Sequence, residues 1–286
     1  MARILVPLDE SPLAEESLPW AAMLARAEGA TVHLLSVIPS EAEFWEMMDV
    51  DPRKPIAAAQ ESLQGYLAAI QSGAVVRGVR VTTEVRDGDP AEQITLASAE
   101  GGTSLIAVTT RGRGDGNGPG FGSVTDRLVR RSVVPVMVVP PGTAAEAIHR
   151  IVVPLDGSRE AERALEPARR LAKALGAQVA LLRAIDPGPA LRYPEFPAEA
   201  IEARLRERAV QYLDKVAGPN EDRAVVTGRP AAAIDTFAKE EPCELIVMAT
   251  HGRGGAVRLE LGSVSDAVIR QADRPVFLVR VPVPAM

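Results

Sequence analysis

The stretch RILVPLDES, from Arg3 to Ser11, returns as RIVVPLDGS from Arg150 to Ser158. When the chain is shifted by 147 residues, 19 of the 35 positions that begin at these two arginines are identical. Further along, the shift becomes 140, where GDPAEQI from Gly88 aligns with GRPAAAI from Gly228. A repeat of this length and order indicates that the chain is a tandem duplication of one structural unit.

The length and composition of the chain agree with two globular units. The 286 residues suffice for two domains of about 100–200 residues each. We expect the first domain at residues 1–141 and the second at residues 148–286. Hydrophobic residues make up 47% of the chain and aromatic residues only 3%, so the expected cores consist mostly of Val, Leu, Ile and Ala.

Within each copy, short apolar runs alternate with helical segments. RILVPL and RIVVPL are apolar throughout, which is typical of strands buried on both faces. The segment from Ser11 to Gly29 has a helical composition and a glycine that we expect as its C-cap. Further helices are expected from Ile56 to Gln71 and after Asp89, an N-cap residue followed by proline. This alternation predicts an α/β fold of two tandem Rossmann-like domains, each with a five-stranded parallel sheet and helices on both faces.

The order of the strands follows from the position of two unusual loops. In each copy, an acidic loop follows the first expected strand and a glycine-rich loop follows the fourth. In open parallel sheets, the ligand crevice lies at the carboxyl ends of the strands, where the winding reverses. If both loops border one crevice, the first and fourth strands are neighbours, and the strand order is 3-2-1-4-5.

The glycine-rich loops read TRGRGDGNGPGFGSV from Thr110 and THGRGGAVRLELGSV from Thr250. Glycine allows another group to approach the backbone closely, and the serine opens a helix whose first N–H groups are unpaired and partly positive. These features together predict an anion site of the phosphate-binding kind. The residues concerned are Gly112, Gly122 and Ser123 in the first copy, Gly252, Gly262 and Ser263 in the second, and Arg111, Arg113 and Arg253 for additional charge.

A purely structural interpretation of these loops stays open beside the functional one. The serines and the aspartates three residues later have the spacing of a capping box, so they serve equally well to start a helix. The loops are not Walker loops, since no Gly-Lys-Ser or Gly-Lys-Thr ends them, and the dinucleotide fingerprint belongs after the first strand. Asp9 and Asp156, at the end of the first strand of each copy, contact ribose hydroxyls or a phosphate-bound metal, or else cap the next helix.

Charge and cysteine content exclude several classes of function. A net charge of −6 argues against a broad nucleic-acid or anionic-membrane surface. No apolar stretch approaches the ~18–20 residues of a membrane span, and MARILVPLDE enters a strand-like run without room for a signal peptide. Cys243 is the single cysteine, and we expect it to be buried and inert. With no intrachain disulfide to form, the expected location is the cytoplasm.

Three segments carry a resemblance to a known family. VPLDGS, GRPAAAI and MATHGRGGAVRLELGSVSDAVIRQADRPVFLV together resemble the universal stress protein family, and the resemblance spans both copies and nearly the whole chain. It implies the five-stranded fold and, as in many members, ATP binding through Gly-x2-Gly-x9-Gly followed by Ser or Thr, with Mg2+ carried by the phosphates. The first glycine of that pattern is replaced by Thr109 in the first copy and by Ala249 in the second.

The resemblance also implies which positions contact ATP. They comprise the aspartate after strand one, the backbone at the end of strand two, the glycine-rich loop and the start of the following helix. In the second copy these positions are Asp156, Ala184, Ala249, Gly252, Arg253, Gly262, Ser263 and Val264. In the first copy they are Asp9, Val37, Thr109, Gly112, Gly122, Ser123 and Val124. The first copy departs further from the family, since Glu10 replaces the usual glycine and DGNGPGF replaces an apolar loop, so we expect the second site to bind better.

The expected function is that of an ATP-binding stress-response regulator, non-catalytic or at most a slow ATPase, that also contacts a protein partner. The alternatives are a genuine nucleotide hydrolase and a partner-binding module with a degenerate pocket. No Cys/His cluster has metal-ligand spacing. His251 is the histidine to weigh as a general base, but nothing in the sequence places the proton it would accept. We therefore expect no catalytic or metal-binding residues.

The two copies are also expected to join within one chain. PVMVV and PVFLV end the copies and are apolar on both faces. In the order 3-2-1-4-5 each is an edge strand, and long apolar edges favour pairing. We expect these two strands to pair antiparallel, so that the chain imitates a dimer of single copies; a homodimer through other surfaces is a further option.

Overall fold

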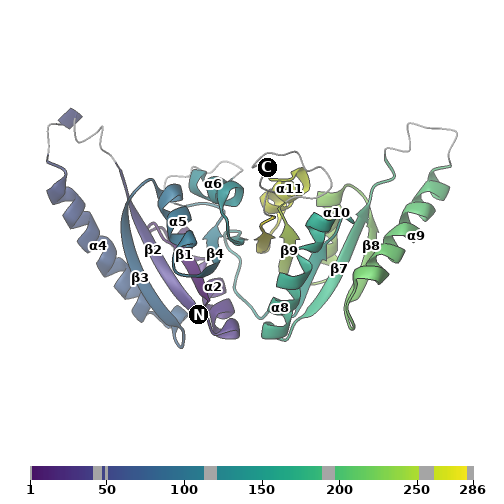
Figure 1. Ribbon diagram of the computed structural model, residues 1–286, viewed down its shortest axis with the longest axis horizontal. Coiled ribbons are helices and arrows are strands. Elements are labelled where there is room, and N and C mark those ends of the chain that lie inside the picture. Colours follow the sequence, from purple (N-terminus) through teal and green to yellow (C-terminus); the bar gives the residue numbers. More distant parts are fainter. Residues whose placement is uncertain are drawn as a thin grey trace. The chain divides into compact units, whose positions relative to one another are not determined.

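The computed structural model of the protein describes residues 2–40, 47–48, 51–112, 121–188, 197–250 and 261–281. The chain divides into two compact units, Met1–Ala145 and Glu146–Met286, and Figure 1 labels their elements. Each strand pairing described within a unit is parallel. The expected α/β class with parallel sheets is confirmed.

The first unit contains five strands in the order β3-β2-β1-β4-β5. The strands are β1 (Arg3–Pro7), β2 (Thr31–Pro39), β3 (Arg80–Gly88), β4 (Thr103–Thr109) and β5 (Val136–Val139). The helices are α1 (Pro12–Glu15), α2 (Leu18–Glu28), α4 (Arg53–Ser72), α5 (Pro90–Ala99) and α6 (Ser123–Arg131), with a short 3-10 helix at Ala74–Val76. Strand β1 is central, because Ile4 aligns with Val32 on one side and with Leu105 on the other.

The second unit repeats this arrangement, with its strands in the order β8-β7-β6-β9-β10. The strands are β6 (Arg150–Pro154), β7 (Gln178–Ile185), β8 (Asp222–Thr227), β9 (Leu245–Ala249) and β10 (Val276–Val279). The helices are α7 (Arg159–Glu162), α8 (Leu165–Leu175), α9 (Ala198–Val216), α10 (Pro230–Glu240) and α11 (Ser263–Gln271). Val152 of the central strand β6 aligns with Ala180 and with Ile246.

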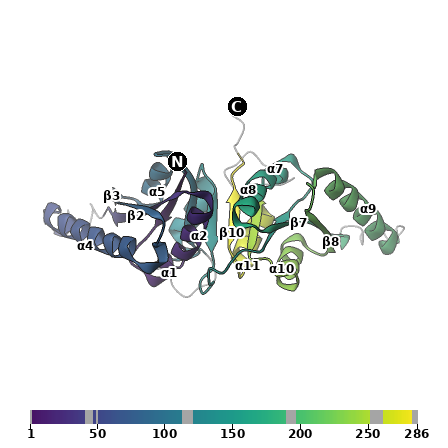
Figure 2. The same ribbon diagram turned by 90° about the horizontal axis from the view of Figure 1, so that it is seen from below.

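Helices lie on both sides of each sheet. Figure 2 shows α2 and α5 on opposite sides of the first sheet, and α8 and α10 on opposite sides of the second. The central strands are therefore covered on both faces, and their apolar runs are buried: Ile4, Leu5 and Val6 are fully inaccessible to solvent. This is the physical reason why the runs lack the polar alternation of a half-exposed strand.

The helix expected from Ser11 to Gly29 is in fact two helices, α1 and α2, which meet at Glu16 and Ser17. Pro19 has no N–H group to donate to the carbonyl of Glu15, so the chain cannot continue one α-helix through this point. The expected end is confirmed, since Gly29 caps α2 with φ 65°, a left-handed conformation that glycine adopts without strain.

The expected N-cap of α5 is confirmed as well. The Asp89 carboxylate accepts a hydrogen bond of 2.8 Å from the backbone N–H of Glu92. The same carboxylate lies 2.6 Å from the Arg127 guanidinium of α6, which lowers the pKa of Asp89 together with the cap bond. At the matching position of the second unit, Arg229 precedes α10 and makes no side-chain cap.

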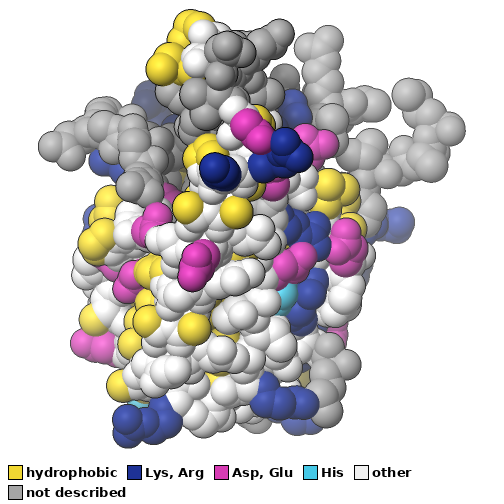
Figure 3. Space-filling model, turned by 90° about the vertical axis from the view of Figure 1, so that its left-hand side faces the viewer, with side chains coloured by type: hydrophobic (Ala, Val, Ile, Leu, Met, Phe, Trp, Pro, Cys, Tyr) yellow, Lys and Arg dark blue, Asp and Glu magenta, His cyan; other side chains and the backbone are white. Residues whose placement is uncertain are grey.

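Charges of both signs are interspersed on the surface of the first unit that Figure 3 presents. In the part of the chain that the structure describes, none of the helices combines the length and the apolar character that crossing a bilayer requires.

Candidate functional site: a cavity at the strand ends

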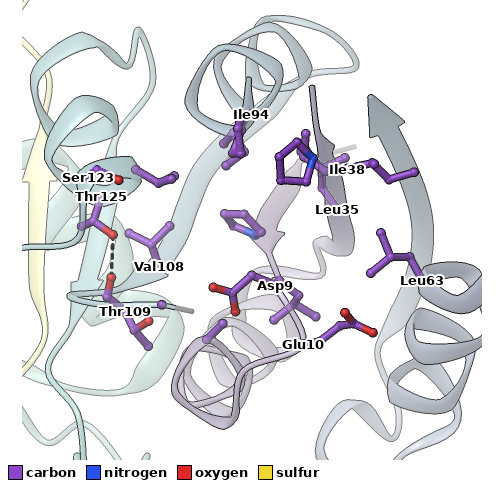
Figure 4. A pocket seen from close by; sticks show the side chains of 18 of the residues that line it. Asp9, Glu10, Leu35, Ile38, Leu63, Ile94, Val108, Thr109, Ser123 and Thr125 are labelled. Carbon is purple, nitrogen blue, oxygen red and sulfur yellow. Dashed lines mark hydrogen bonds between the residues drawn. The ribbon is translucent and has the colours of Figure 1, made fainter. Parts of the chain in front are cut away.

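A cavity of about 490 Å³ lies at the carboxyl ends of β1, β2 and β4 in the first unit. Its volume lies within the range of small-molecule binding sites, about 300–1,000 Å³. Figure 4 shows its apolar walls and, facing them, the polar side chains of Asp9, Thr109 and Ser123. The walls come from Leu35, Ile38, Leu63, Ile94 and Val108. An apolar pocket with a few convergent polar groups is the usual form of a ligand site.

Asp9 follows β1 directly and lines the cavity. One of its oxygens, Oδ1, accepts hydrogen bonds from the backbone N–H of Ser11 at 3.1 Å and from the Ser11 hydroxyl at 2.5 Å. Ser11 in turn caps α1 by accepting from the Ala14 N–H at 3.1 Å. The N-cap of α1 is therefore Ser11, and Asp9 positions Ser11 through these two hydrogen bonds. The alternative that Asp9 itself caps the helix is wrong.

The second oxygen of Asp9, Oδ2, faces the start of the glycine-rich loop. A Cβ atom built on Gly112 would fall against this oxygen. Glycine is the residue that permits such a close approach of backbone and carboxylate. The contact brings the loop after β1 and the start of the loop after β4 to the same side of the cavity, as expected of a common crevice.

Among the described residues, no side chain caps the N-terminus of α6, which lies at this cavity. Its N-cap residue is Gly122, and Ser123 and Val124 in its first turn line the cavity. Ser123 is exposed and is not the N-cap, so the capping-box alternative for this serine is wrong. The first N–H groups of a helix carry partial positive charge when no side chain satisfies them.

Two hydrogen bonds hold the ends of the glycine-rich loop together. The Gly122 N–H donates to the Thr110 carbonyl at 2.8 Å. The Thr125 hydroxyl donates to the Thr109 carbonyl at 2.8 Å, the bond drawn as a dashed line in Figure 4. The buried Thr109 hydroxyl donates to the Arg111 carbonyl at 2.6 Å. The Thr109 side chain, which replaces the first glycine of the family pattern, is therefore hydrogen-bonded within its own loop.

Glu10 has a backbone conformation that is unusual for its residue type. Its φ is 63°, in the left-handed region, whereas the matching residue of the second unit is Gly157 with φ 79°. A side chain with a Cβ atom in this region costs roughly 1–2 kcal/mol. The duplication has therefore kept the turn after the first strand while exchanging the residue that fits it best. Glu10 lines the cavity and is exposed at its mouth.

Replacing Glu10 by glycine is expected to raise the free energy of unfolding of the first unit by about 1 kcal/mol, because the left-handed strain is relieved. Urea denaturation of the Glu10→Gly and Glu10→Ala variants measures this change. Glu10→Ala removes the same charge but keeps a Cβ atom, so it should show no gain. Equal stabilisation by both variants would mean that charge, not backbone conformation, is responsible.

The described part of the second unit repeats most of this geometry. Asp156 accepts from the Ser158 N–H at 2.9 Å and from its hydroxyl, and Gly262 is the N-cap of α11 without a side-chain cap. The Gly262 N–H donates to the Thr250 carbonyl at 2.8 Å, and the Ser265 hydroxyl donates to the Ala249 carbonyl at 2.9 Å. As in the first unit, the serine after the glycine is exposed and is not the N-cap, so its capping-box alternative is also wrong.

The remaining expected site residues fall into two groups. In the first unit, Val37 joins Asp9, Thr109, Gly112, Ser123 and Val124 in the lining of the cavity, and Gly122 adjoins it as the N-cap of α6. In the second unit, Ala184 lies near the end of β7, Ala249 ends β9, and Ser263 and Val264 open α11. The predicted positions Gly252 and Arg253, like Arg113 and His251, lie outside the described residues.

Two matched positions give the units different charges near the strand-one aspartate. In the first unit, the Ser36 hydroxyl donates to the Leu8 carbonyl at 2.9 Å. In the second unit, the matching residue is Arg183, whose guanidinium donates to the matching Leu155 carbonyl at 2.9 Å. Together with the exchange of Glu10 for Gly157, this gives the second unit the less acidic surroundings.

His33 and Cys243 are titratable residues that lie away from the cavity lining. Burial lowers the pKa of His33, against the effect of its hydrogen bond to Glu84 at 2.9 Å. Cys243 is buried as expected, and burial raises its pKa to about 11, so its thiol stays protonated at neutral pH. Within the described ranges, no group of three or more His, Cys, Asp or Glu residues is placed to hold a metal ion.

The apolar walls of the cavity were not predicted from the sequence. Leu63 comes from α4 and Ile94 from α5, far from the two loops in the sequence. Both belong to ordinary amphipathic helices, and periodicity alone does not tell which apolar residue of such a helix faces a crevice rather than the core. The replacement of glycine by Glu10 was the one available signal for a side chain at the cavity mouth.

Comparison with known proteins gives consistent matches over the whole chain. A family model described as the universal stress protein family matches residues 1–140 and again residues 147–280. A universal stress protein of Mycobacterium tuberculosis is 29% identical over 306 residues, which cover 98% of this chain and 95% of that protein. A universal stress protein of Mycolicibacterium smegmatis is 30% identical over 293 residues, covering 97% and 96%. A solved universal stress protein from Archaeoglobus fulgidus shares the fold, with a TM-score of 0.72 at 24% identity and coverage of 97% and 98%.

Proposed function

Because the chain belongs to the universal stress protein family, we propose that it acts in the stress response as an ATP-binding regulator. ATP binds with Mg2+ carried by its phosphates, and the second unit provides the tighter site. The observation that carries this proposal is the convergence, at the strand ends of the first unit, of an apolar cavity, a carboxylate and an uncapped helix N-terminus. The second unit repeats the carboxylate and the helix start.

The residues at the strand ends fit the three parts of a nucleotide. In the first unit, the walls near Ile38 and Val108 suit a flat apolar base, and Asp9 provides a carboxylate that accepts hydrogen bonds from ribose hydroxyls. The first N–H groups of α6 suit phosphate oxygens. The second unit has the same aspartate and the same helix start, at Asp156 and Gly262.

The energy that such contacts supply is enough for a micromolar ligand. A hydrogen bond to a charged group contributes roughly 1.5–3 kcal/mol. Three or four of them at Gly262, Ser263 and Val264 and in the glycine-rich loop, together with the burial of the base, reach about −8 kcal/mol after the cost of association. A site of micromolar affinity is occupied at millimolar concentrations of ATP.

Protein purified without added nucleotide is expected to carry adenine nucleotide, because ATP in the cell fills a site of micromolar affinity. The measurement is to denature the fresh protein and assay the supernatant for adenine nucleotides, and to record the thermal shift at millimolar ATP. A stripped and refilled sample serves as the positive control. An empty supernatant together with no thermal shift would contradict the proposal and favour a partner-binding module with a degenerate pocket.

A nucleotide hydrolase is the other alternative, and turnover separates it from a regulator. Typical enzymes turn over at roughly 1 per second or faster. We expect a much lower rate here, because no general base has been identified at the described part of either site. Release of inorganic phosphate from ATP under saturating conditions measures it, and a rate above about 1 per second would overturn the non-catalytic assignment.

A further inference from the structure

The two crevices differ in charge at positions that the duplication makes equivalent. Beside the strand-one aspartate, the first unit has Glu10 and Ser36, and the second has Gly157 and Arg183. Two carboxylates therefore stand in the first unit where one carboxylate and one guanidinium stand in the second. The difference acts on two matching tyrosines. Burial and Glu15 raise the pKa of Tyr66, and the charges of Asp9 and Glu10 add to this rise. Burial and Glu162 raise the pKa of Tyr212, and Arg183 opposes that rise.

Glu10 has the position of a selectivity residue. Figure 4 shows it beside Asp9 at the edge of the cavity nearest Leu63. It is exposed and belongs to the cavity lining, so its charge acts on a polyphosphate that enters the cavity. Arg111 is the positively charged residue of the described lining and is accompanied there by both carboxylates. The described lining thus has one more carboxylate than guanidinium, and this negative charge favours a neutral ligand over a polyanion.

We propose that the first unit binds an uncharged nucleoside and that Glu10 excludes nucleoside polyphosphates from its cavity. This inference rests on the proposed nucleotide-binding function and assigns different ligands to the two units. The apolar walls receive the base, and Asp9 accepts hydrogen bonds from ribose hydroxyls, which a nucleoside and a nucleotide present alike. The units differ in whether they tolerate phosphate charge. A chain of this kind senses ATP in one half and a dephosphorylated nucleoside in the other.

The strain at Glu10 supports a functional role for this side chain. Gly157 shows that the turn is compatible with glycine, which is free of the left-handed penalty. Residues held in such conformations are concentrated at ligand sites, where a particular side chain is required despite its cost. The observed φ of 63° at Glu10 is thus a second observation, independent of charge, that points to the same residue.

The test uses the full-length chain with its second site disabled by Gly262→Val. Calorimetric titration of this variant with adenosine and with Mg-ATP is expected to show adenosine binding at least about tenfold tighter, or about 1.4 kcal/mol. Adding Glu10→Gln, which keeps the size of the side chain and removes its charge, should strengthen ATP binding about tenfold and change adenosine binding less than about threefold. Raising the salt concentration should narrow the difference between the two ligands, because an exposed charge is screened.

The reciprocal exchange provides the matched control. Gly157→Glu, in an otherwise unchanged chain, should weaken ATP binding by the second unit about tenfold. The inference is overturned if the Gly262→Val chain does not bind adenosine, if it binds ATP equally well, or if Glu10→Gln leaves ATP affinity unchanged. The proposed function fails under a different result. If the unmodified chain binds no ATP, the proposed function is contradicted, whatever the adenosine titration shows.

Discussion

Replacing Gly262 by valine is expected to weaken ATP binding by the second unit at least about 100-fold. Gly262 is the N-cap of α11, directly before the N–H groups that are proposed to receive the phosphates. A branched side chain at this position prevents a phosphate from reaching those groups. The loss of two charge-assisted hydrogen bonds, at roughly 1.5–3 kcal/mol each, exceeds the 2.8 kcal/mol or so that corresponds to a 100-fold change.

The effect on folding should be small in comparison. Gly262 has φ −61° and ψ 145°, which valine adopts without strain, and loss of a glycine N-cap costs about 1 kcal/mol or less. Calorimetric titration measures binding, and the far-ultraviolet circular dichroism spectrum checks the fold. Gly122→Val is the matched control in the first unit and should leave the second site intact. If Gly262→Val binds ATP normally, the glycine serves only to turn the chain.

Replacing Phe277 by aspartate is expected to unfold the second unit. Phe277 lies on β10, aligned with Val247 of β9, and is only 1% exposed. Truncating a buried phenylalanine costs about 3–5 kcal/mol, and burying an unpaired carboxylate adds several more. The sum is comparable to the entire stability of a domain, about 5–15 kcal/mol.

Differential scanning calorimetry should show the loss of the transition that belongs to the second unit. Phe277→Leu is the control, since it keeps the site apolar and should cost about 1 kcal/mol. A Phe277→Asp chain with the stability of the original would show that the burial of β10 does not hold the unit together.

The antiparallel pairing of the two fifth strands stays a prediction. The same variant tests it by small-angle scattering, in which the two halves should separate if they remain folded.

Local patterns in the sequence were enough to predict the elements and their type. Apolar runs such as RILVPL, the glycine C-cap at Gly29 and the Asp89 N-cap depend on residues within a turn or two, so the sequence carries the information directly. Because the chain is a tandem duplication, each element predicted in one copy was also predicted in the other. The break between α1 and α2 was missed although Pro19 signals it, because the helical composition on both sides outweighed one residue.

The composition of the cavity was decided by tertiary packing. Leu63 and Ile94 face it because α4 and α5 pack on the sheet at particular rotations, which depend on contacts between distant parts of the chain. The roles of Asp9 and Ser11 were settled in the same way, since Oδ1 holds the helix cap while Oδ2 meets Gly112 across the crevice. The sequence marked Glu10 as a departure from glycine, but its place at the cavity mouth and its left-handed backbone follow from the fold, in which the turn after β1 keeps its shape whichever residue occupies it.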